Sequence, residues 1–266
     1  MPGFGWGSGL ALFLAFALLI GSAARVEAGG PSRHHYAPAD DALCGVGLAP
    51  LMGSVALPHT VAALAGGKPL LVVALGSSST QGYGASAPEN AYPAQLADLL
   101  QSRFPGSAIT VVNKGVGGDN IENMLDRLPV DVLALKPQLV IWQTGTNDAI
   151  KSLPPERFRA ALLNGLRALQ VKSIDTILMT PQYAPKFTAA SDYDIYLDVM
   201  REAAAQQKVP LFRRFGLSRR WATEQRFADI PFVAPDGLHP TDASYRCTAV
   251  LLTEGISRLA GKAAIQ

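Results

Sequence analysis

The chain has 266 residues, a net charge of +2 and two cysteines. This length suffices for one large domain that buries its own core without a metal or a dense set of disulfides. The small net charge, with no basic cluster interleaved with aromatic residues, argues against a nucleic-acid-binding protein. The basic pairs Arg213-Arg214 and Arg219-Arg220 are accordingly expected on a solvated face.

The segment Met1–Ala28 predicts a secretory signal peptide. Leu10–Ile20 is almost wholly apolar, and Val26–Ala28 resembles a small-x-small cleavage site, although Met1–Ser8 carries no Lys or Arg. An uncleaved membrane anchor is the alternative, but the apolar run is shorter than the ~20 residues of a spanning helix. We therefore expect an exported protein, periplasmic or extracellular, that meets a membrane only through this segment if it stays uncleaved.

The two cysteines, Cys44 and Cys247, lie in the exported part. Export implies an oxidising compartment, and an even count permits one disulfide. Two separate buried thiols are the alternative. Their spacing excludes a redox CxxC motif and a zinc knuckle, and His34-His35 has no further ligands around it, so we expect no metal.

Residues 29–68 predict an N-terminal arm with a short helix over Leu57–Gly67, and residues 69–266 predict one domain in which strands and helices alternate. The apolar runs predict strands over Leu70–Leu75, Ala108–Asn113, Leu139–Gln143, Thr176–Thr180 and Val209–Phe212. The intervening patterns predict helices over Tyr92–Phe104, from Ile121 to Leu128, Pro155–Val171, Asp192–Gln207 and Thr241–Leu259. Such alternation is typical of a parallel sheet with helices on both faces.

Four loops of unusual composition accompany these elements: Gly76–Thr80, Asn113–Asp119, Gln143–Asp148 and Asp236–Pro240. The first three follow strands, so in a parallel sheet they share the edge where open α/β folds bind ligands. Taken singly, each loop has an ordinary explanation, such as a tight turn, a helix cap or a dinucleotide-binding loop. Taken together, they predict one site.

The four loops, in this order, resemble the SGNH subfamily of GDSL-type serine esterases and lipases. Ser78 takes the position of the family's serine, and Gly118 that of the second motif's glycine. Gly145–Asp148 matches G-x-N-D, and Asp236–His239 matches D-x-x-H. The resemblance covers Leu70 to about Val250 and implies a flavodoxin-like, three-layer α/β/α fold.

The first motif departs from the family at two positions. Ser77 stands where the family usually has aspartate, and Ser79 where it often has leucine. The aspartate is not a member of the triad, so the departure leaves catalysis possible and removes only a local hydrogen-bonding group. It also places three serines in a row, and alignment alone selects Ser78 as the nucleophile.

The residue types fit ester hydrolysis. Ser78 would attack the carbonyl carbon, His239 would take the serine proton and return it to the leaving alcohol, and Asp236 would orient the imidazole. The backbone N–H groups of Ser78 and Gly118 and the side-chain amide of Asn147 would stabilise the oxyanion. This chemistry needs no metal and no cofactor.

Gln143, Gln182 and Tyr183 are candidate substrate-binding residues, because Gln143 ends the third predicted strand and Gln182 and Tyr183 follow the fourth. Export favours a small acyl group, such as acetyl, on a carbohydrate or cell-envelope polymer. A lysophospholipase or thioesterase is one alternative. A non-catalytic carbohydrate-binding protein on the same scaffold is another, and a nucleotide-binding flavodoxin-like module is a third, which would leave Asp236–His239 without a role.

Overall fold

The computed structural model describes residues 43–45, 52–190, 192–224 and 228–263, together with Gly3 and Gly5. The chain divides into two units, Met1–Ser32 and Arg33–Gln266, and every helix and strand given below belongs to the second. The predicted signal peptide, apart from the two glycines, and the pair His34-His35 lie outside the described residues. Among the helices within the described ranges, none has the length and apolar character needed to cross a membrane.

Five parallel strands form the sheet at the centre of the fold. They are arranged in the order β2-β1-β3-β4-β5. Their bounds are β1 Leu70–Gly76, β2 Ile109–Gly115, β3 Leu139–Gln143, β4 Asp175–Met179 and β5 Leu211–Phe212. This is the flavodoxin-like strand order, in which the switch between β1 and β3 opens a crevice at the carboxyl ends of the strands. The predicted fold class is confirmed.

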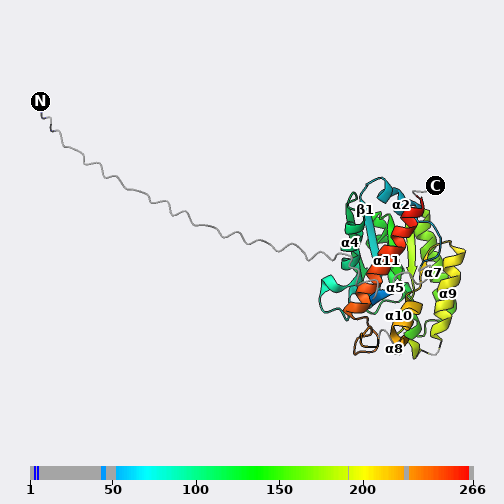
Figure 1. Ribbon diagram of the computed structural model, residues 1–266. Coiled ribbons are helices and arrows are strands. Elements are labelled where there is room, and N and C mark those ends of the chain that lie inside the picture. The colour runs from blue at the N-terminus through cyan, green and yellow to red at the C-terminus, as the bar shows by residue number, and fades with distance from the viewer. Residues whose placement is uncertain are drawn as a thin grey trace. The chain divides into compact units, whose positions relative to one another are not determined.

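Both faces of the sheet are covered by helices (Figure 1). One face packs against α2 Pro58–Ala65, α4 Tyr92–Arg103, α10 Arg214–Thr223 and α11 Asp242–Ala263. The other packs against α5 Ile121–Asp131, α7 Pro155–Val171 and α9 Tyr193–Gln206. Because successive side chains of a strand point to opposite faces, Val72 and Ala74 enter the first layer, and Val73 and Leu75 enter the second.

The predicted strands and long helices agree with the observed ones to within a few residues, and β3 and α7 agree at both ends. The sequence patterns missed α10 and the one-turn helices α3 Ser78–Gln81, α6 Thr146–Ile150 and α8 Pro185–Thr188. The short helices are too brief to show a period. Helix α10 has the sequence RFGLSRRWAT, with a glycine and five basic or small polar positions that obscure its apolar face.

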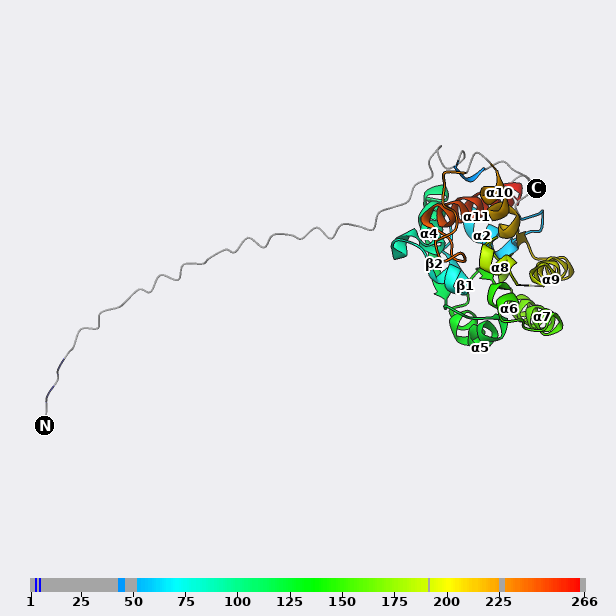
Figure 2. The same ribbon diagram turned by 90° about the horizontal axis from the view of Figure 1, so that it is seen from below.

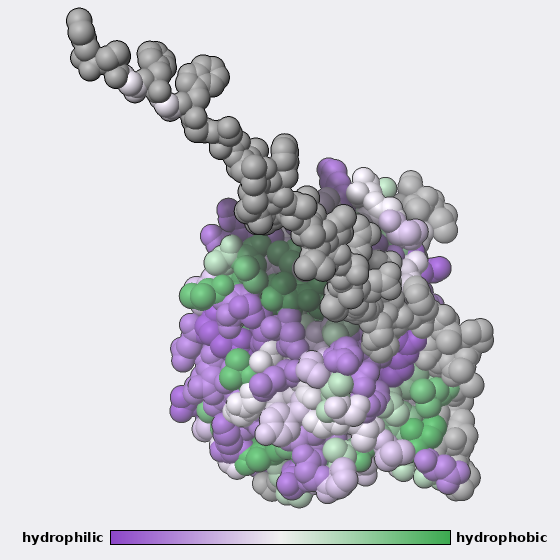
Figure 3. Space-filling view, turned by 90° about the vertical axis from the view of Figure 1, so that its left-hand side faces the viewer, coloured by the Kyte–Doolittle hydropathy of each residue, from purple (hydrophilic) through white to green (hydrophobic). Residues whose placement is uncertain are grey.

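The loops that follow β1 to β4 meet at one edge of the sheet. Figure 2 looks onto this edge, where α6 follows β3 in the chain and α8 follows β4. The face shown in Figure 3 is mostly hydrophilic, with one larger hydrophobic area near its top and smaller hydrophobic groups elsewhere. Because open α/β sheets bind ligands at the carboxyl ends of their strands, we expect the functional site among the polar side chains of these loops.

A disulfide joins Cys44 to Cys247 across 203 positions of sequence, with Cα atoms 5.0 Å apart. Cys247 lies in α11 and is fully buried, and Cys44 is 1% exposed. The bond therefore fastens the segment before α2 to the last helix. A cross-link that closes so long a loop restricts the unfolded chain strongly.

Reduction of this disulfide is expected to lower the free energy of unfolding by about 2–5 kcal/mol. The measurement is denaturant unfolding with and without dithiothreitol. The matched control is the double variant Cys44→Ala/Cys247→Ala, whose unfolding midpoint should not respond to reductant. An equal midpoint for the oxidised and reduced wild type would contradict a stabilising role.

Candidate active site

Ser78 begins α3, directly after β1, and is the accessible member of the three serines. Ser77 and Ser79 are buried at 2% and 1% exposure, whereas Ser78 is partly exposed. The helix ends after one turn at Gly82, whose φ of +112° suits only glycine. The strand–turn–helix geometry thus presents one hydroxyl of the three to the carboxyl edge of the sheet.

A chain of hydrogen bonds runs from Ser78 to Asp236 through His239. The Oγ of Ser78 lies 2.8 Å from Nε2 of His239, and Nδ1 of His239 is hydrogen-bonded to the Asp236 carboxylate. With the Nδ1 proton directed at the carboxylate, Nε2 is the acceptor for the serine hydroxyl. A neutral imidazole held in this tautomer can withdraw the serine proton.

Asp236 is fixed by its own turn. Its Oδ1 accepts hydrogen bonds from the backbone N–H groups of Leu238 and His239, both at 2.9 Å. Partial burial opposes ionisation, but the bonds from the His239 side chain and from the two N–H groups outweigh it and lower the pKa of Asp236 to about 2. The carboxylate is therefore ionised at neutral pH and can stabilise an imidazolium that forms beside it during proton transfer.

Gly117 and Gly118 belong to the loop after β2, and a Cβ atom at Gly117 would lie 4.0 Å from the Cβ of Ser78. Gly118 has a φ of +82°, which favours glycine. Gln81 accepts a hydrogen bond from the Gly117 N–H at 2.8 Å, and Lys151 donates to the Gly118 carbonyl at 2.6 Å. Side chains of α3 and of the residue after α6 therefore hold the orientation of both peptides.

Asn147, in α6, is held by the same loop. One N–H of its side-chain amide donates to the Asp119 carbonyl at 2.8 Å. An amide carries two such protons, so the second is left for another acceptor. A neutral donor at this place can bind a developing negative charge without competing with the Ser78–His239 pair.

Asp148, next to Asn147, has a structural role. It is fully buried and accepts hydrogen bonds from the backbone N–H groups of Ile121 and Gly145, at 2.8 and 3.0 Å. Burial raises the pKa of Asp148 to about 6, although these two hydrogen bonds act in the opposite direction. The carboxylate joins the start of α5 to the start of α6, and so fixes the loop that carries Asn147.

Gln143 is fully buried, so the structure corrects its prediction as a substrate-binding residue. Its Oε1 accepts from the backbone N–H of Ser77 at 3.0 Å, the Ser77 hydroxyl at 3.1 Å and the Thr80 hydroxyl at 3.2 Å. The Ser77 side chain, which stands where the family usually carries aspartate, has its partner here. Gln143 and Ser77 together brace the turn that presents Ser78.

The prediction that Gln182 binds substrate is also corrected, because its side chain is 3% exposed and both ends of its amide are hydrogen-bonded within the protein. Its Nε2 donates to the Leu238 carbonyl at 2.7 Å, and its Oε1 accepts from Arg214 at 2.7 Å. Tyr183 is half-buried, and its ring packs edge-on against Phe215 with centroids 5.6 Å apart. Gln182 therefore supports the His239 loop instead of meeting substrate.

The burial of Arg214 contradicts the prediction that both basic pairs lie on a solvated face. Arg213 and Arg219 are exposed, but Arg214 is 1% exposed beneath the site. Sequence alone gave no signal for this, since nothing in the basic string distinguishes one arginine from another. The roles of Gln81 and Lys151 were also missed, because each side chain is hydrogen-bonded to a backbone group more than 30 positions away in sequence.

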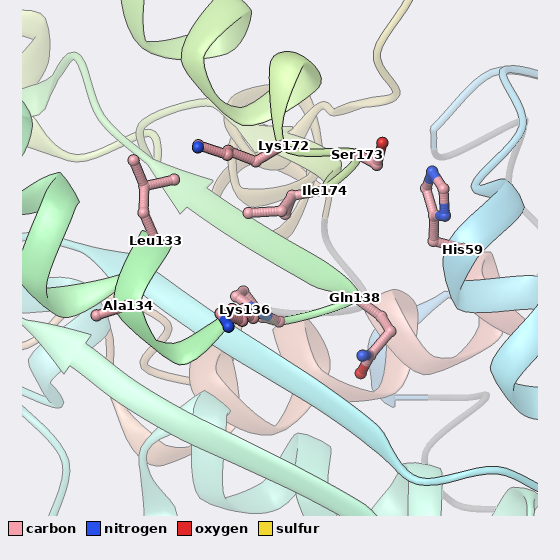
Figure 4. A pocket seen from close by; sticks show the side chains of 9 residues that line it. His59, Leu133, Ala134, Lys136, Gln138, Lys172, Ser173 and Ile174 are labelled. Carbon is pink, nitrogen blue, oxygen red and sulfur yellow. The ribbon is translucent and has the colours of Figure 1, made fainter.

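A cavity of about 620 Å³ lies at the opposite edge of the sheet, before β3 and β4. Figure 4 shows its lining side chains, which come from α2, from the turn before β3 and from the segment between α7 and β4. They are His59, Leu133, Ala134, Lys136, Pro137, Gln138, Lys172, Ser173 and Ile174. None belongs to the Ser78 cluster. Among the described residues, no group of three or more His, Cys, Asp or Glu could hold a metal ion.

A three-layer α/β/α fold whose carboxyl edge joins a serine, a histidine and an aspartate defines a hydrolase of the SGNH/GDSL type. The chain belongs to the non-GDSL lipase-like family, which it matches over residues 44–262. It is an esterase, a hydrolase that acts on ester bonds. The expected family is thus confirmed, and the non-catalytic and nucleotide-binding alternatives are set aside.

Three curated relatives illustrate this likeness. The chain is 28% identical over 169 residues to an arylesterase of Vibrio mimicus, covering 64% of this chain and 79% of the relative. It is 26% identical over 166 residues to thioesterase 1/protease 1/lysophospholipase L1 of Escherichia coli K12, covering 62% and 73%. It is 34% identical over 102 residues to an acetylxylan esterase of Geobacillus stearothermophilus, covering 35% and 47%.

Solved structures agree on the fold. A two-domain esterase active on acetylated mannans superposes with a TM-score of 0.64 at 22% identity, over 77% of this chain and 53% of that one. The chain thus spans about half the length of that esterase. The acetylxylan esterase of G. stearothermophilus superposes with a TM-score of 0.58 at 24% identity, over 70% and 94%.

Replacing Gln143 by Met is expected to lower stability by about 1–3 kcal/mol, because three donors of the nucleophile turn lose their buried acceptor. It should also lower kcat, because the turn that presents Ser78 loosens. The measurements are denaturant unfolding and hydrolysis of p-nitrophenyl acetate. The control is Gln138→Met, which removes an acceptor from the Leu71 N–H at the other end of β1 and should leave kcat unchanged. Equal kcat values for the two variants would refute the bracing role.

Proposed function

We propose that the chain is an exported serine esterase that hydrolyses carboxylic esters with Ser78 as nucleophile, His239 as general base and Asp236 as the group that orients the base. The observation that carries the proposal is the hydrogen-bonded chain between these three side chains. Each side chain has in this chain the hydrogen-bond partner that its proposed role needs. The roles also agree with the family's motifs.

The first half of the reaction forms an acyl-enzyme. His239 takes the Ser78 proton at Nε2 as Oγ attacks the ester carbonyl, and the imidazolium that results is stabilised by Asp236. The same proton then passes to the leaving alcohol as the tetrahedral intermediate collapses. Water, activated by His239 in turn, releases the acid and restores the serine.

The oxyanion of each tetrahedral intermediate would be bound by the N–H groups of Ser78 and Gly118 and by the free proton of the Asn147 amide. Support comes from the orientation of these groups: Gln81 and Lys151 fix the glycine loop, and Asp119 fixes the amide. Donors that are fixed before the reaction need no reorganisation when charge develops.

For the substrate, we propose a short acyl group, acetyl first, on a carbohydrate. Two relatives support this class by name: the acetylxylan esterase and the esterase active on acetylated mannans. Tyr83 adds a structural argument. Its side chain is 60% exposed, and its ring centroid lies 5.0 Å from that of His239. His239 returns a proton to the leaving alcohol, so Tyr83 flanks that alcohol with an aromatic surface.

Export is proposed from the sequence of Met1–Ala28. A relative in Bacillus subtilis, 25% identical over 216 residues, is named an uncharacterized lipoprotein, which supports a location outside the cytoplasm. A disulfide between Cys44 and Cys247 fits an oxidising compartment.

The nucleophile is tested by labelling with a fluorophosphonate probe. Wild type, Ser77→Ala and Ser79→Ala should be labelled, whereas Ser78→Ala should not. Loss of Ser78 should also lower kcat on the order of 10⁶-fold, as in comparable triads. The two flanking variants are matched controls, since each removes one hydroxyl from the same turn. Labelling that persists in Ser78→Ala would overturn the assignment.

The acyl preference is tested with a series of p-nitrophenyl esters from acetyl to dodecanoyl. We expect kcat/KM to be highest for acetyl and to fall as the chain lengthens. A maximum at octanoyl or beyond would favour the lysophospholipase and thioesterase alternative, to which the Escherichia coli relative belongs by name. Release of acetate from acetylated xylan or mannan would then test the carbohydrate itself.

A further inference from the structure

Arg214 is a buried cation beside the site to which the reaction assigns no role. It begins α10 and is 1% exposed. Among the described residues, no carboxylate is bonded to it, and its Nη1 has no hydrogen-bond partner. Burying a guanidinium without a counter-charge is costly. A residue kept at such a cost calls for a function that a neutral side chain could not supply.

The guanidinium holds two segments of the active-site edge. Its Nε donates to the Thr180 carbonyl at 3.1 Å, and its Nη2 donates to the Gln182 side chain at 2.7 Å. The same Nη2 lies 3.5 Å from the hydroxyl of Ser79, the neighbour of the nucleophile. Arg214 therefore connects the loop after β4 with the helix that presents Ser78.

Arg214 also decides which way the Gln182 amide faces. A guanidinium has donors only, so the Gln182 oxygen must face it. The amide nitrogen then faces the Leu238 carbonyl, to which it donates at 2.7 Å. A reversed amide would bring two oxygens together at Leu238 and two donors together at Arg214. The guanidinium, which can only donate, and the Leu238 carbonyl, which can only accept, together exclude that arrangement.

The Leu238 carbonyl belongs to the peptide that carries His239. The N–H groups of Leu238 and His239 are held by Asp236 at 2.9 Å, and the carbonyl between them is held by Gln182. The turn is thus fixed from both sides. Without the second attachment, the peptide plane could rotate and draw Nε2 away from its 2.8 Å contact with Ser78.

We propose that Arg214 is a positioning residue for His239, acting through the Gln182 amide and the Leu238 carbonyl. The inference rests on the proposed role of His239 as general base. It assigns to Arg214 the alignment of the base, so its loss should act on kcat and on the rate of serine labelling, with little effect on KM.

The decisive variant is Gln182→Glu. A glutamate accepts from Arg214 and supplies the missing counter-charge, but its carboxylate cannot donate to the Leu238 carbonyl. Stability should therefore be retained, while kcat for p-nitrophenyl acetate and the fluorophosphonate labelling rate fall by about tenfold or more, with KM within about twofold. Arg214→Met should lower kcat similarly. The control is Arg220→Met, on the same helix, which loses only an ion pair to Glu224 and should keep wild-type kinetics.

Unchanged kcat and labelling in Gln182→Glu would overturn the inference. So would Arg214→Met if it lowered only stability, with wild-type kcat per folded molecule. If Arg214→Met does not fold, Gln182→Glu decides alone. The proposed function fails separately: a wild-type protein whose Ser78 the probe does not label would refute it before any variant is compared.

Discussion

The fold has to hold one hydrogen bond, the 2.8 Å contact between Ser78 Oγ and His239 Nε2, which joins residues 161 positions apart. The proposed nucleophile and the proposed base come from loops near the two ends of the domain's sequence. A displacement of 1 Å would break the contact and can cost about 100-fold in rate. The sheet brings the loops to one edge, but strand geometry alone does not fix a side chain within a loop.

Buried polar side chains provide that precision on each side. Gln143 accepts three hydrogen bonds from the turn that carries Ser77 and Thr80. Gln182 accepts a hydrogen bond from Arg214 and donates one to the Leu238 carbonyl, in the peptide that leads to His239. Polar groups removed from water are costly unless they are bonded, so each has a strong preference for one arrangement. The result is a partly exposed serine and histidine over a rigid polar layer.

The groups proposed to bind the oxyanion are held in the same way. Gly118 supplies a backbone conformation that a side chain would oppose, and Lys151 and Gln81 fix the peptides around it. Asp148, buried beneath Asn147, ties the starts of two helices together. These contacts join parts of the chain that are distant in sequence, and they are made by ordinary residue types.

Motifs mark the residues proposed for catalysis, whereas ordinary residue types make the supporting contacts. This contrast explains which parts of the structure could be predicted from the sequence. The strands were predictable because apolar runs buried on both faces are distinctive, and α7 was predictable from its apolar stripe. The cluster of Ser78, His239 and Asp236 was predictable from the motifs, because ester hydrolysis restricts the residue types at those positions. The catalytic roles of these residues, and that of Asn147, are proposals. The contacts of Arg214 and Gln182 were not predictable, because burial and pairing arise only when β4, α10 and the last loop come together.

In the proposed mechanism, ester hydrolysis passes through an acyl group on Ser78. The most direct measurement is mass spectrometry of peptides from the protein quenched during turnover of p-nitrophenyl acetate. We expect one acetyl group on the peptide that contains residues 77–79, located by fragmentation at Ser78. Turnover with no acetylated serine, or with the acetyl group on Ser77 or Ser79, would contradict it.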